Sequence, residues 1–235
     1  GLDDTISQAS SVAVGTNVAA ASTINGGIGN DTYNLTIATQ AALTSLTTSG
    51  ADANSTALTS VENANVTVTA SGGAVDLTTV GALPATLSVL TVSGTDNNAA
   101  LAATFGATGQ TVTVNNTTLA GNASTITFGA FVSQSATTGS GDDIFNTIAV
   151  DGITANGGIG TDTFNITAVA ALNDNDGVML TLNGGTGADV LTFAAGFIGA
   201  VDFTDTTDIS LTSIETLNLG IVGTADAAAE TLTVT

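Results

Sequence analysis

Three nine-residue segments of this chain place glycine and aspartate in one order, Gly-Gly-x-Gly-x-Asp-x-apolar-x. They span residues 26–34, 157–165 and 184–192. The glycines permit a tight turn with positive φ and expose main-chain carbonyl oxygens, and the aspartate adds a carboxylate. Hard oxygen ligands of this kind favour Ca²⁺ over transition metals. Because one turn supplies only half of a coordination sphere, the pattern predicts turns that stack beside one another around several calcium ions.

The candidate calcium ligands are the motif glycines and aspartates, together with those of two shorter, related segments that contain an Asp-Asp pair. They are Gly26, Gly27, Gly29, Asp31, Gly157, Gly158, Gly160, Asp162, Gly184, Gly185, Gly187 and Asp189 in the full motifs, and Gly141, Asp142, Asp143, Asp3 and Asp4 in the shorter segments. The alternative is a glycine-Asx turn without metal. It applies most to Asp3 and Asp4, whose partner turn would precede them.

The net charge of the chain supports the prediction that it binds a cation. Seventeen Asp and three Glu give a net charge of −20, and the chain contains no Lys, Arg or His. No carboxylate can therefore form a salt bridge with a side chain, so a cluster of carboxylates needs a raised pKa or a bound cation. Nucleic acids and anionic membranes are disfavoured as partners, because both are bound through Lys or Arg. The absence of Cys excludes disulfides and thiolate metal sites.

The same composition argues against catalysis. Without His, Cys, Lys or Arg, the chain lacks the usual bases, nucleophiles and phosphate clamps. A glycosidase-type carboxylate pair remains formally possible, but the chain has no Trp and one Tyr to stack on a sugar. We therefore expect that the protein is not an enzyme. No 18-residue apolar run or signal peptide is present, so we expect no membrane insertion and an export signal outside this sequence.

Short alternating segments predict a fold built from β-strands. They lie at residues 65–69, 87–92, 111–114, 125–128 and 230–235. The apolar centres Val68, Leu90 and Val112 are spaced by 22 residues, a period suited to the coils of a solenoid. The sequence thus predicts an all-β fold, a β-solenoid or parallel β-helix with few or no helices. Residues 99–105 are the best candidate for a short helix.

A longer repeat divides the chain. Residues 26–36 match residues 157–167, and each copy follows an Asp-Asp pair and precedes a Leu-Thr-Ser-(Val/Ile)-Glu segment. We interpret residues 1–137 and 138–235 as two related β modules stacked continuously. Asp4 and Asp31, like Asp162 and Asp189, are 27 residues apart, which does not fit a uniform roll of 18 residues per turn. A coil of about 27 residues would place each pair in register.

The nonapeptides resemble the calcium-binding repeats of RTX (haemolysin-type) proteins. The resemblance implies that glycine carbonyls and the aspartate of one turn share Ca²⁺ with the next turn of a parallel β-roll. The Thr- and Ala-rich remainder resembles bacterial S-layer proteins and giant surface adhesins, which use such repeats sparsely. The implied function is an extracellular, calcium-stabilised structural repeat that self-associates into a surface array, sheath or filament. The alternatives are a spacer of a giant adhesin and the calcium-folded region of a type I secreted protein.

Three other acidic features receive non-metal interpretations. Residues 173–177 start like an EF-hand but lack its first ligand and its final Glu, which favours an exposed polar turn. Asp202, Asp205 and Asp208 are interpreted as a solvated loop. Glu62 and Glu215 occupy equivalent places in the two modules, and we expect them to have a structural role at a corner.

Overall fold

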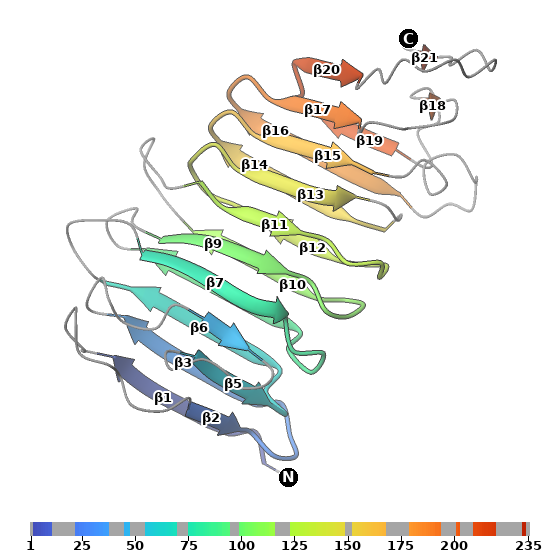
Figure 1. Cartoon of the computed structure of the whole chain (residues 1–235). Coiled ribbons are helices and arrows are strands. Elements are labelled where there is room, and N and C mark those ends of the chain that lie inside the picture. Colours follow the sequence, from blue (N-terminus) through green and yellow to red (C-terminus); the bar gives the residue numbers. More distant parts are fainter. Residues whose placement is uncertain are drawn as a thin grey trace.

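The computed structural model describes residues 2–10, 22–37, 45–47, 55–69, 75–94, 99–115, 123–148, 152–167, 179–193, 201–202, 209–219 and 232–233. These residues form strands and turns without a helix, and the strands stack into an elongated parallel β-solenoid (Figure 1). The predicted all-β solenoid fold is therefore confirmed. None of the described segments is a helix long and apolar enough to cross a membrane.

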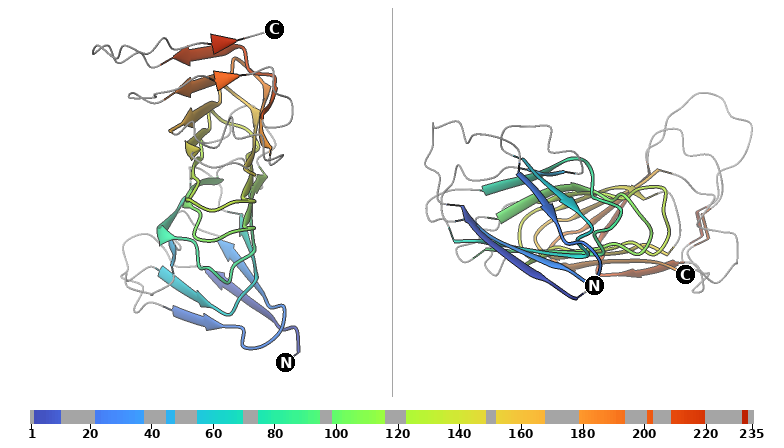
Figure 2. Two further views of the ribbon diagram at one scale, coloured as in Figure 1. Left: turned by 90° about the vertical axis from the view of Figure 1, so that its right-hand side faces the viewer. Right: turned by 90° about the horizontal axis from the view of Figure 1, so that it is seen from below.

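Two parallel sheets form the walls of the solenoid, and the chain alternates between them as it climbs (Figure 2). Sheet A contains, in spatial order, β1 (Thr5–Ser10), β3 (Thr32–Ile37), β6 (Asn63–Val68), β8 (Val89–Gly94), β10 (Thr111–Asn115), β12 (Ser135–Thr137), β14 (Thr154–Ile159), β16 (Leu180–Thr186) and β19 (Ile209–Thr212). Sheet B contains β2 (Ser22–Asn25), β5 (Ser55–Thr59), β4 (Ser45–Thr47), β7 (Val75–Ala82), β9 (Ala99–Thr104), β11 (Thr125–Thr127), β13 (Ile144–Ile148), β15 (Thr163–Ile166), β17 (Val190–Phe193) and β20 (Thr216–Leu219).

Two features depart from a simple alternation of strands. In sheet B, β4 lies between β5 and β7, so the chain doubles back within one coil. Near the C-terminal end, β18 (Val201–Asp202) pairs with β21 (Leu232–Thr233) in a separate two-stranded sheet. All described pairings, including these, are parallel, as expected when successive coils run in the same direction.

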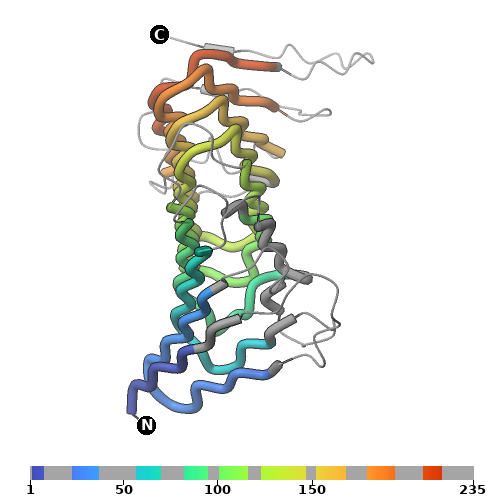
Figure 3. Tube along the Cα trace, turned by 90° about the vertical axis from the view of Figure 1, so that its left-hand side faces the viewer, coloured from blue at the N-terminus to red at the C-terminus, as the bar shows by residue number. Residues whose placement is uncertain are grey.

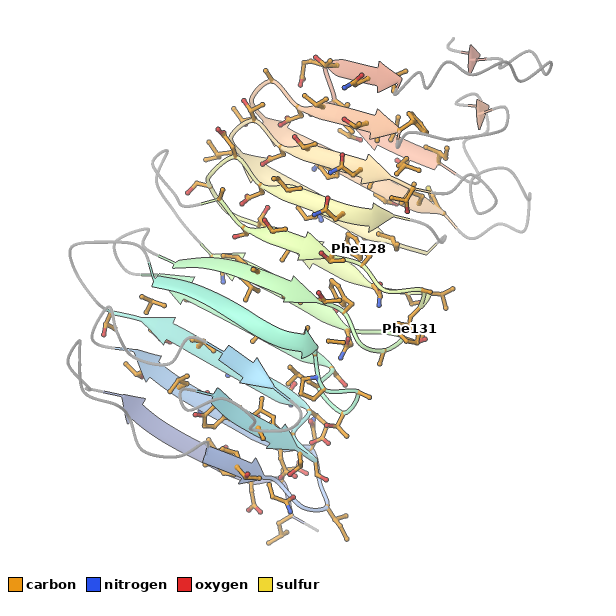
Figure 4. The ribbon with its side chains drawn as sticks, viewed as in Figure 1. Phe128 and Phe131 are labelled. Atoms are coloured by element: carbon orange, nitrogen blue, oxygen red, sulfur yellow. The ribbon has the colours of Figure 1, made fainter. Side chains whose placement is uncertain are left out.

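The core lies between the two sheets and is built from columns of side chains in register. One column on sheet A runs through Tyr33, Ala64, Leu90 and Val112, all fully buried. On the other side, the rings of Phe105, Phe128, Phe145 and Phe164 are stacked, with centroids 5.1, 6.4 and 4.9 Å apart. Such offset stacks add to the burial energy. Figure 4 labels Phe128, which belongs to this stack.

The helix expected at residues 99–105 is wrong, because residues 99–104 form β9. Leu101, Ala103 and Phe105 are buried and the residues between them are half-buried, a period of two. Ala103 pairs with Ile126 of the next coil. Packing between coils therefore overrides the helix propensity of the alanines, which is a weak preference.

The coils differ in length but stay aligned along the stack (Figure 3). The expected 22-residue step is confirmed between Leu90 and Val112, which pair directly. It is wrong for Val68, because Val68 pairs with Gly94 and Leu90 pairs with Ala64. A solenoid requires only that strands stack, so the connections between strands can vary in length.

Strands occur at each predicted segment that the structure describes, including residues 63–68 and 111–115. Of the segment at 230–235, only Leu232 and Thr233 are described, as β21. Sheet A continues through the proposed module boundary, since β12 ends at Thr137 and pairs with both β10 and β14. The division into residues 1–137 and 138–235 stays a prediction.

Candidate functional site

The motif turns lie at two corners of the solenoid. Corner 1 is where the chain turns into a strand of sheet A, and corner 2 is where it turns into a strand of sheet B. The turn at residues 26–31 connects β2 to β3 and lies at corner 1. The turns at 157–162 and 184–189 connect β14 to β15 and β16 to β17, and they lie at corner 2. The three motif turns are therefore divided between two corners of one stack, one at corner 1 and two at corner 2.

Corner 2 contains a ladder of carboxylates, in which Asp143, Asp162 and Asp189 are buried and Glu215 is exposed. In each step, a carboxylate oxygen accepts a hydrogen bond from the backbone N–H of the corresponding residue one coil earlier. The N–H of Asp143 donates to Oδ1 of Asp162, and that of Asp162 donates to Oδ1 of Asp189, both at 2.8 Å. Asp143 accepts from the N–H of Ser124, and Glu215 accepts from the N–H of Asp189. The carboxylate thus replaces the carbonyl that would pair with this N–H inside a sheet.

Corner 1 contains a shorter ladder of the same kind. The N–H of Asp4 donates to Oδ1 of Asp31 at 2.8 Å, and the N–H of Asp31 donates to Oε2 of Glu62 at 2.7 Å. The expected alignment of Asp4 with Asp31, and of Asp162 with Asp189, is confirmed. Glu62 and Glu215 close the two ladders, which confirms the structural corner role expected for them.

The two members of each Asp-Asp pair do different things, a distinction that the sequence did not reveal. Asp4 and Asp143 belong to the ladders described above. Asp3 and Asp142 are exposed, and each accepts a hydrogen bond from the backbone N–H of the next coil. For Asp142 the donor is Thr161, at 2.7 Å. The first aspartate of each pair is therefore an outer tie between coils.

At corner 2, the structure explains why glycine occupies positions 157, 158 and 160. A Cβ atom on Gly157 would lie 2.0 Å from Oδ2 of Asp162, so only glycine leaves room for the inward carboxylate. Gly158 has a φ of 100°, which side-chain-bearing residues rarely adopt. A Cβ atom on Gly160 would lie 2.0 Å from the carbonyl oxygen of Gly141. Close stacking of turns by itself therefore explains much of the pattern.

One oxygen of each ladder aspartate has no partner. Asp31, Asp143, Asp162 and Asp189 are at most 1 % exposed, and the Oδ2 atom of each is buried without a hydrogen bond. An unpaired buried charge is costly in a medium of low dielectric constant. Because the sequence contains no Lys, Arg or His, no side chain can offset these charges.

Burial changes how these carboxyls ionise. It raises the pKa of Asp143 to about 6, although the backbone N–H of Ser124 opposes the change. It raises the pKa of Asp162 to about 7, and the neighbouring charges of Asp143 and Asp189 add to the effect. Burial, assisted by Glu215, also raises the pKa of Asp189. Ionising the ladder near neutral pH therefore costs stability, and a bound proton or cation would offset this cost.

The atoms available to a cation at corner 2 are all oxygens. Within the described ranges, no three acidic side chains converge on one point, so carboxylates alone do not form a metal site. The carbonyls of one turn face the glycines of the next: the oxygen of Gly158 lies beneath Gly185, and that of Gly160 lies beneath Gly187. Asp162, Asp189 and these main-chain carbonyls are therefore the candidate ligands for a calcium ion. This donor set fits a hard cation.

Sequence reasoning missed four polar residues at the corners. Ser124 and Thr138 lie at corner 2, where Thr138 stands in the place of the first motif glycine. Gln110 and Gln134 continue corner 1 beyond Glu62, and both are buried. The sequence signal that could have identified Gln110 and Gln134 is their position, because each directly precedes a strand that alternates polar and apolar residues.

The remaining acidic candidates lie largely outside the described residues. These are residues 173–177, Asp205 and Asp208, whereas Asp202 is the last residue of β18.

No family model, curated protein or solved structure matches this chain.

Proposed function

We propose that this chain is an extracellular, calcium-stabilised structural element of a bacterial surface array, sheath or filament. One observation carries the proposal. Four buried aspartates each have an oxygen without a partner, in a chain that has no cationic side chain. Imported calcium would neutralise these charges, and millimolar calcium is an extracellular condition.

The shape of the molecule supports a structural role. The solenoid is elongated and has two walls of parallel strands, so its length grows with each added coil (Figure 2). The carboxylates that the structure describes in detail act as ties between coils and not as a convergent reactive pair. A non-enzymatic role is part of the proposal, because the chain lacks His, Cys, Lys and Arg.

Calcium dependence of folding is the direct test. At a calcium concentration tenfold above a site's dissociation constant, each site would add about 1.4 kcal/mol to the free energy of unfolding. Four sites would thus add roughly 5–6 kcal/mol, comparable to the whole stability of a domain. Urea unfolding followed by far-UV circular dichroism should show this gain in CaCl₂ and its loss in EGTA. Isothermal titration calorimetry should show binding of calcium to the folded chain.

Two controls make this test specific. MgCl₂ at the same concentration should give a smaller gain, since Mg²⁺ demands near-octahedral geometry and gives up its waters reluctantly. Asp142→Asn, which changes an exposed aspartate, should keep most of the calcium response. Equal stability in calcium and in EGTA, with no heat of binding, would overturn the proposal. Negative-stain microscopy in calcium would separate an assembly protein, seen as lattices or fibres, from an adhesin spacer, seen as single rods.

A further inference from the structure

The sequence Asn-Gly-Gly occurs three times in this chain, at residues 25–27, 156–158 and 183–185, and each copy leads into a motif turn. An asparagine followed by glycine is prone to spontaneous deamidation, because glycine has no Cβ to keep its backbone nitrogen away from the side-chain amide. The two residues after the asparagine are the same in all three copies. The main difference between the copies is therefore where the fold places them.

Two of the three asparagines lie inside strands. β14 continues beyond Asn156 and β16 continues beyond Asn183, and Gly158 pairs with Gly185 after them. Each of these strands has a neighbour on both sides in sheet A. Nδ2 of Asn156 donates to Oγ1 of Thr137 at 3.3 Å, and both asparagines are half-buried. The strand pairing therefore opposes the backbone rotation that would bring the next nitrogen to the side-chain amide.

The third asparagine lies at the end of a strand. Asn25 is exposed and is the last residue of β2, which has β5 as its one neighbour in the described part of sheet B. The N–H of Gly26 donates to the carbonyl oxygen of Thr59, and the N–H of Gly27 donates to Oδ1 of Asn25, both at 3.1 Å. The bond from Gly27 would stabilise the negative charge that develops on Oδ1 when Cγ is attacked.

We propose that Asn25 is a site of spontaneous modification, at which the folded chain forms a succinimide with Gly26 while Asn156 and Asn183 stay intact. The backbone nitrogen of Gly26 loses its proton to water or hydroxide and attacks Cγ of Asn25. The new N–Cγ bond replaces the bond from Cγ to Nδ2, and the side-chain nitrogen leaves as ammonia. Water then opens the cyclic imide to aspartate or isoaspartate. The inference goes beyond the proposed function and does not depend on calcium.

The isoaspartate product would disturb the corner that carries Asp31. Isoaspartate routes the main chain through its own Cβ and Cγ atoms, which lengthens the backbone just before Gly26. The structure leaves little room for a shift there, because a Cβ atom on Gly26 would lie 2.1 Å from the carbonyl oxygen of Ser60 and 2.6 Å from Oδ2 of Asp31. Conversion should therefore loosen the packing of this turn against the next coil, so stability should fall as the molecule ages.

The test is incubation of the chain at pH 8 in CaCl₂, with far-UV circular dichroism to show that it is folded. Peptide mapping by mass spectrometry then measures the conversion at each asparagine separately. In the folded chain, Asn25 should convert at least about tenfold faster than Asn156 or Asn183, because strand ends open at lower free energy than strand interiors. In urea, the three should convert at similar rates, because the residues that follow them are the same.

Asn25→Gln is the matched control, since it keeps an amide at this position but its longer side chain forms the cyclic imide much more slowly. After the same incubation, the urea midpoint of unfolding should fall in the wild-type chain and stay constant in Asn25→Gln. Equal rates at the three asparagines of the folded chain, or a slower rate at Asn25, would overturn the inference. A wild-type chain that converts at Asn25 and still unfolds like fresh protein would overturn the expected loss of stability.

Discussion

Asp31 and Gln110 lie at the same corner of the solenoid but satisfy their surroundings differently. Oε1 of Gln110 accepts from the N–H groups of Gly106 and Ala107, at 2.7 and 3.0 Å. Its Nε2 donates at 2.8 Å to the carbonyls of Pro84 and Leu87. Asp31 has one oxygen bonded to the N–H of Asp4 and a second, buried oxygen with no partner.

The difference follows from the chemistry of the two groups. A corner of a β-solenoid exposes both N–H and C=O groups to its interior, and an amide can donate to one and accept from the other. A carboxylate only accepts hydrogen bonds, so it can pair with N–H groups but cannot donate to the carbonyl oxygens. Gln110 therefore satisfies the N–H and carbonyl groups around it without a proton or a cation. At corner 2, where burial raises the pKa of Asp143 and Asp162, a proton or a cation would offset the buried charge.

The largest expected effect is the pH dependence of stability in calcium-free buffer. The pKa values of Asp143 and Asp162 rise on folding, to about 6 and about 7. Folding thus favours their neutral forms, so their contribution is fully present below about pH 4 and is lost as pH rises through 6 and 7. Together they should make the fold about 5 kcal/mol less stable at pH 8 than at pH 4.

Urea unfolding at a series of pH values, in metal-depleted buffer, measures this dependence. Gln110 does not titrate, so we expect the change to come from Asp143 and Asp162 at corner 2. A double variant with Asp143→Asn and Asp162→Asn should show a flatter profile. Stability that rises between pH 5 and pH 8 without calcium would contradict the comparison.

The spacing of residues in the sequence predicted the aspartate ladders better than it predicted the contacts of Gln110. Asp162 and Asp189 stand in repeated turns, so their alignment follows from a stacked fold. Gln110 follows no glycine motif, and its role depends on Pro84 and Leu87, 26 and 23 residues earlier. Such contacts depend on where each coil closes, which the local sequence does not encode.

The sequence also could not predict that the motif copies lie at two different corners. Asp31 precedes a strand of sheet A, whereas Asp162 precedes a strand of sheet B. Which corner a turn occupies depends on how many strands lie between the copies. The error at residues 99–105 has a related cause, since the neighbours that make Ala103 a strand residue belong to another coil.

A second prediction concerns a substitution that replaces the side-chain amide of Gln110 with a carboxylate. Gln110→Glu would remove the donor to the carbonyls of Pro84 and Leu87 and place a charge beside them. We expect a loss of about 4 kcal/mol in the free energy of unfolding at pH 7.5, as for other unpaired buried charges. Most of the loss should be recovered at pH 4.5, where the protonated carboxyl can donate again. Unfolding in urea at both pH values measures it, and a loss independent of pH would indicate a packing defect instead.

The smallest effect is the most specific, because its sign depends on calcium. Asp162→Asn keeps the acceptor for the N–H of Asp143 but removes the buried charge. Without calcium at pH 8, it should stabilise the fold by about 2 kcal/mol, since burial of the charge no longer opposes folding. In saturating calcium it should destabilise the fold, because a ligand is lost. Asp142→Asn, at an exposed site, should change stability by less than about 0.5 kcal/mol in both conditions. If Asp162→Asn changes stability by the same amount with and without calcium, the carboxylate of Asp162 is not a calcium ligand, and its surroundings need a cation no more than those of Gln110 do.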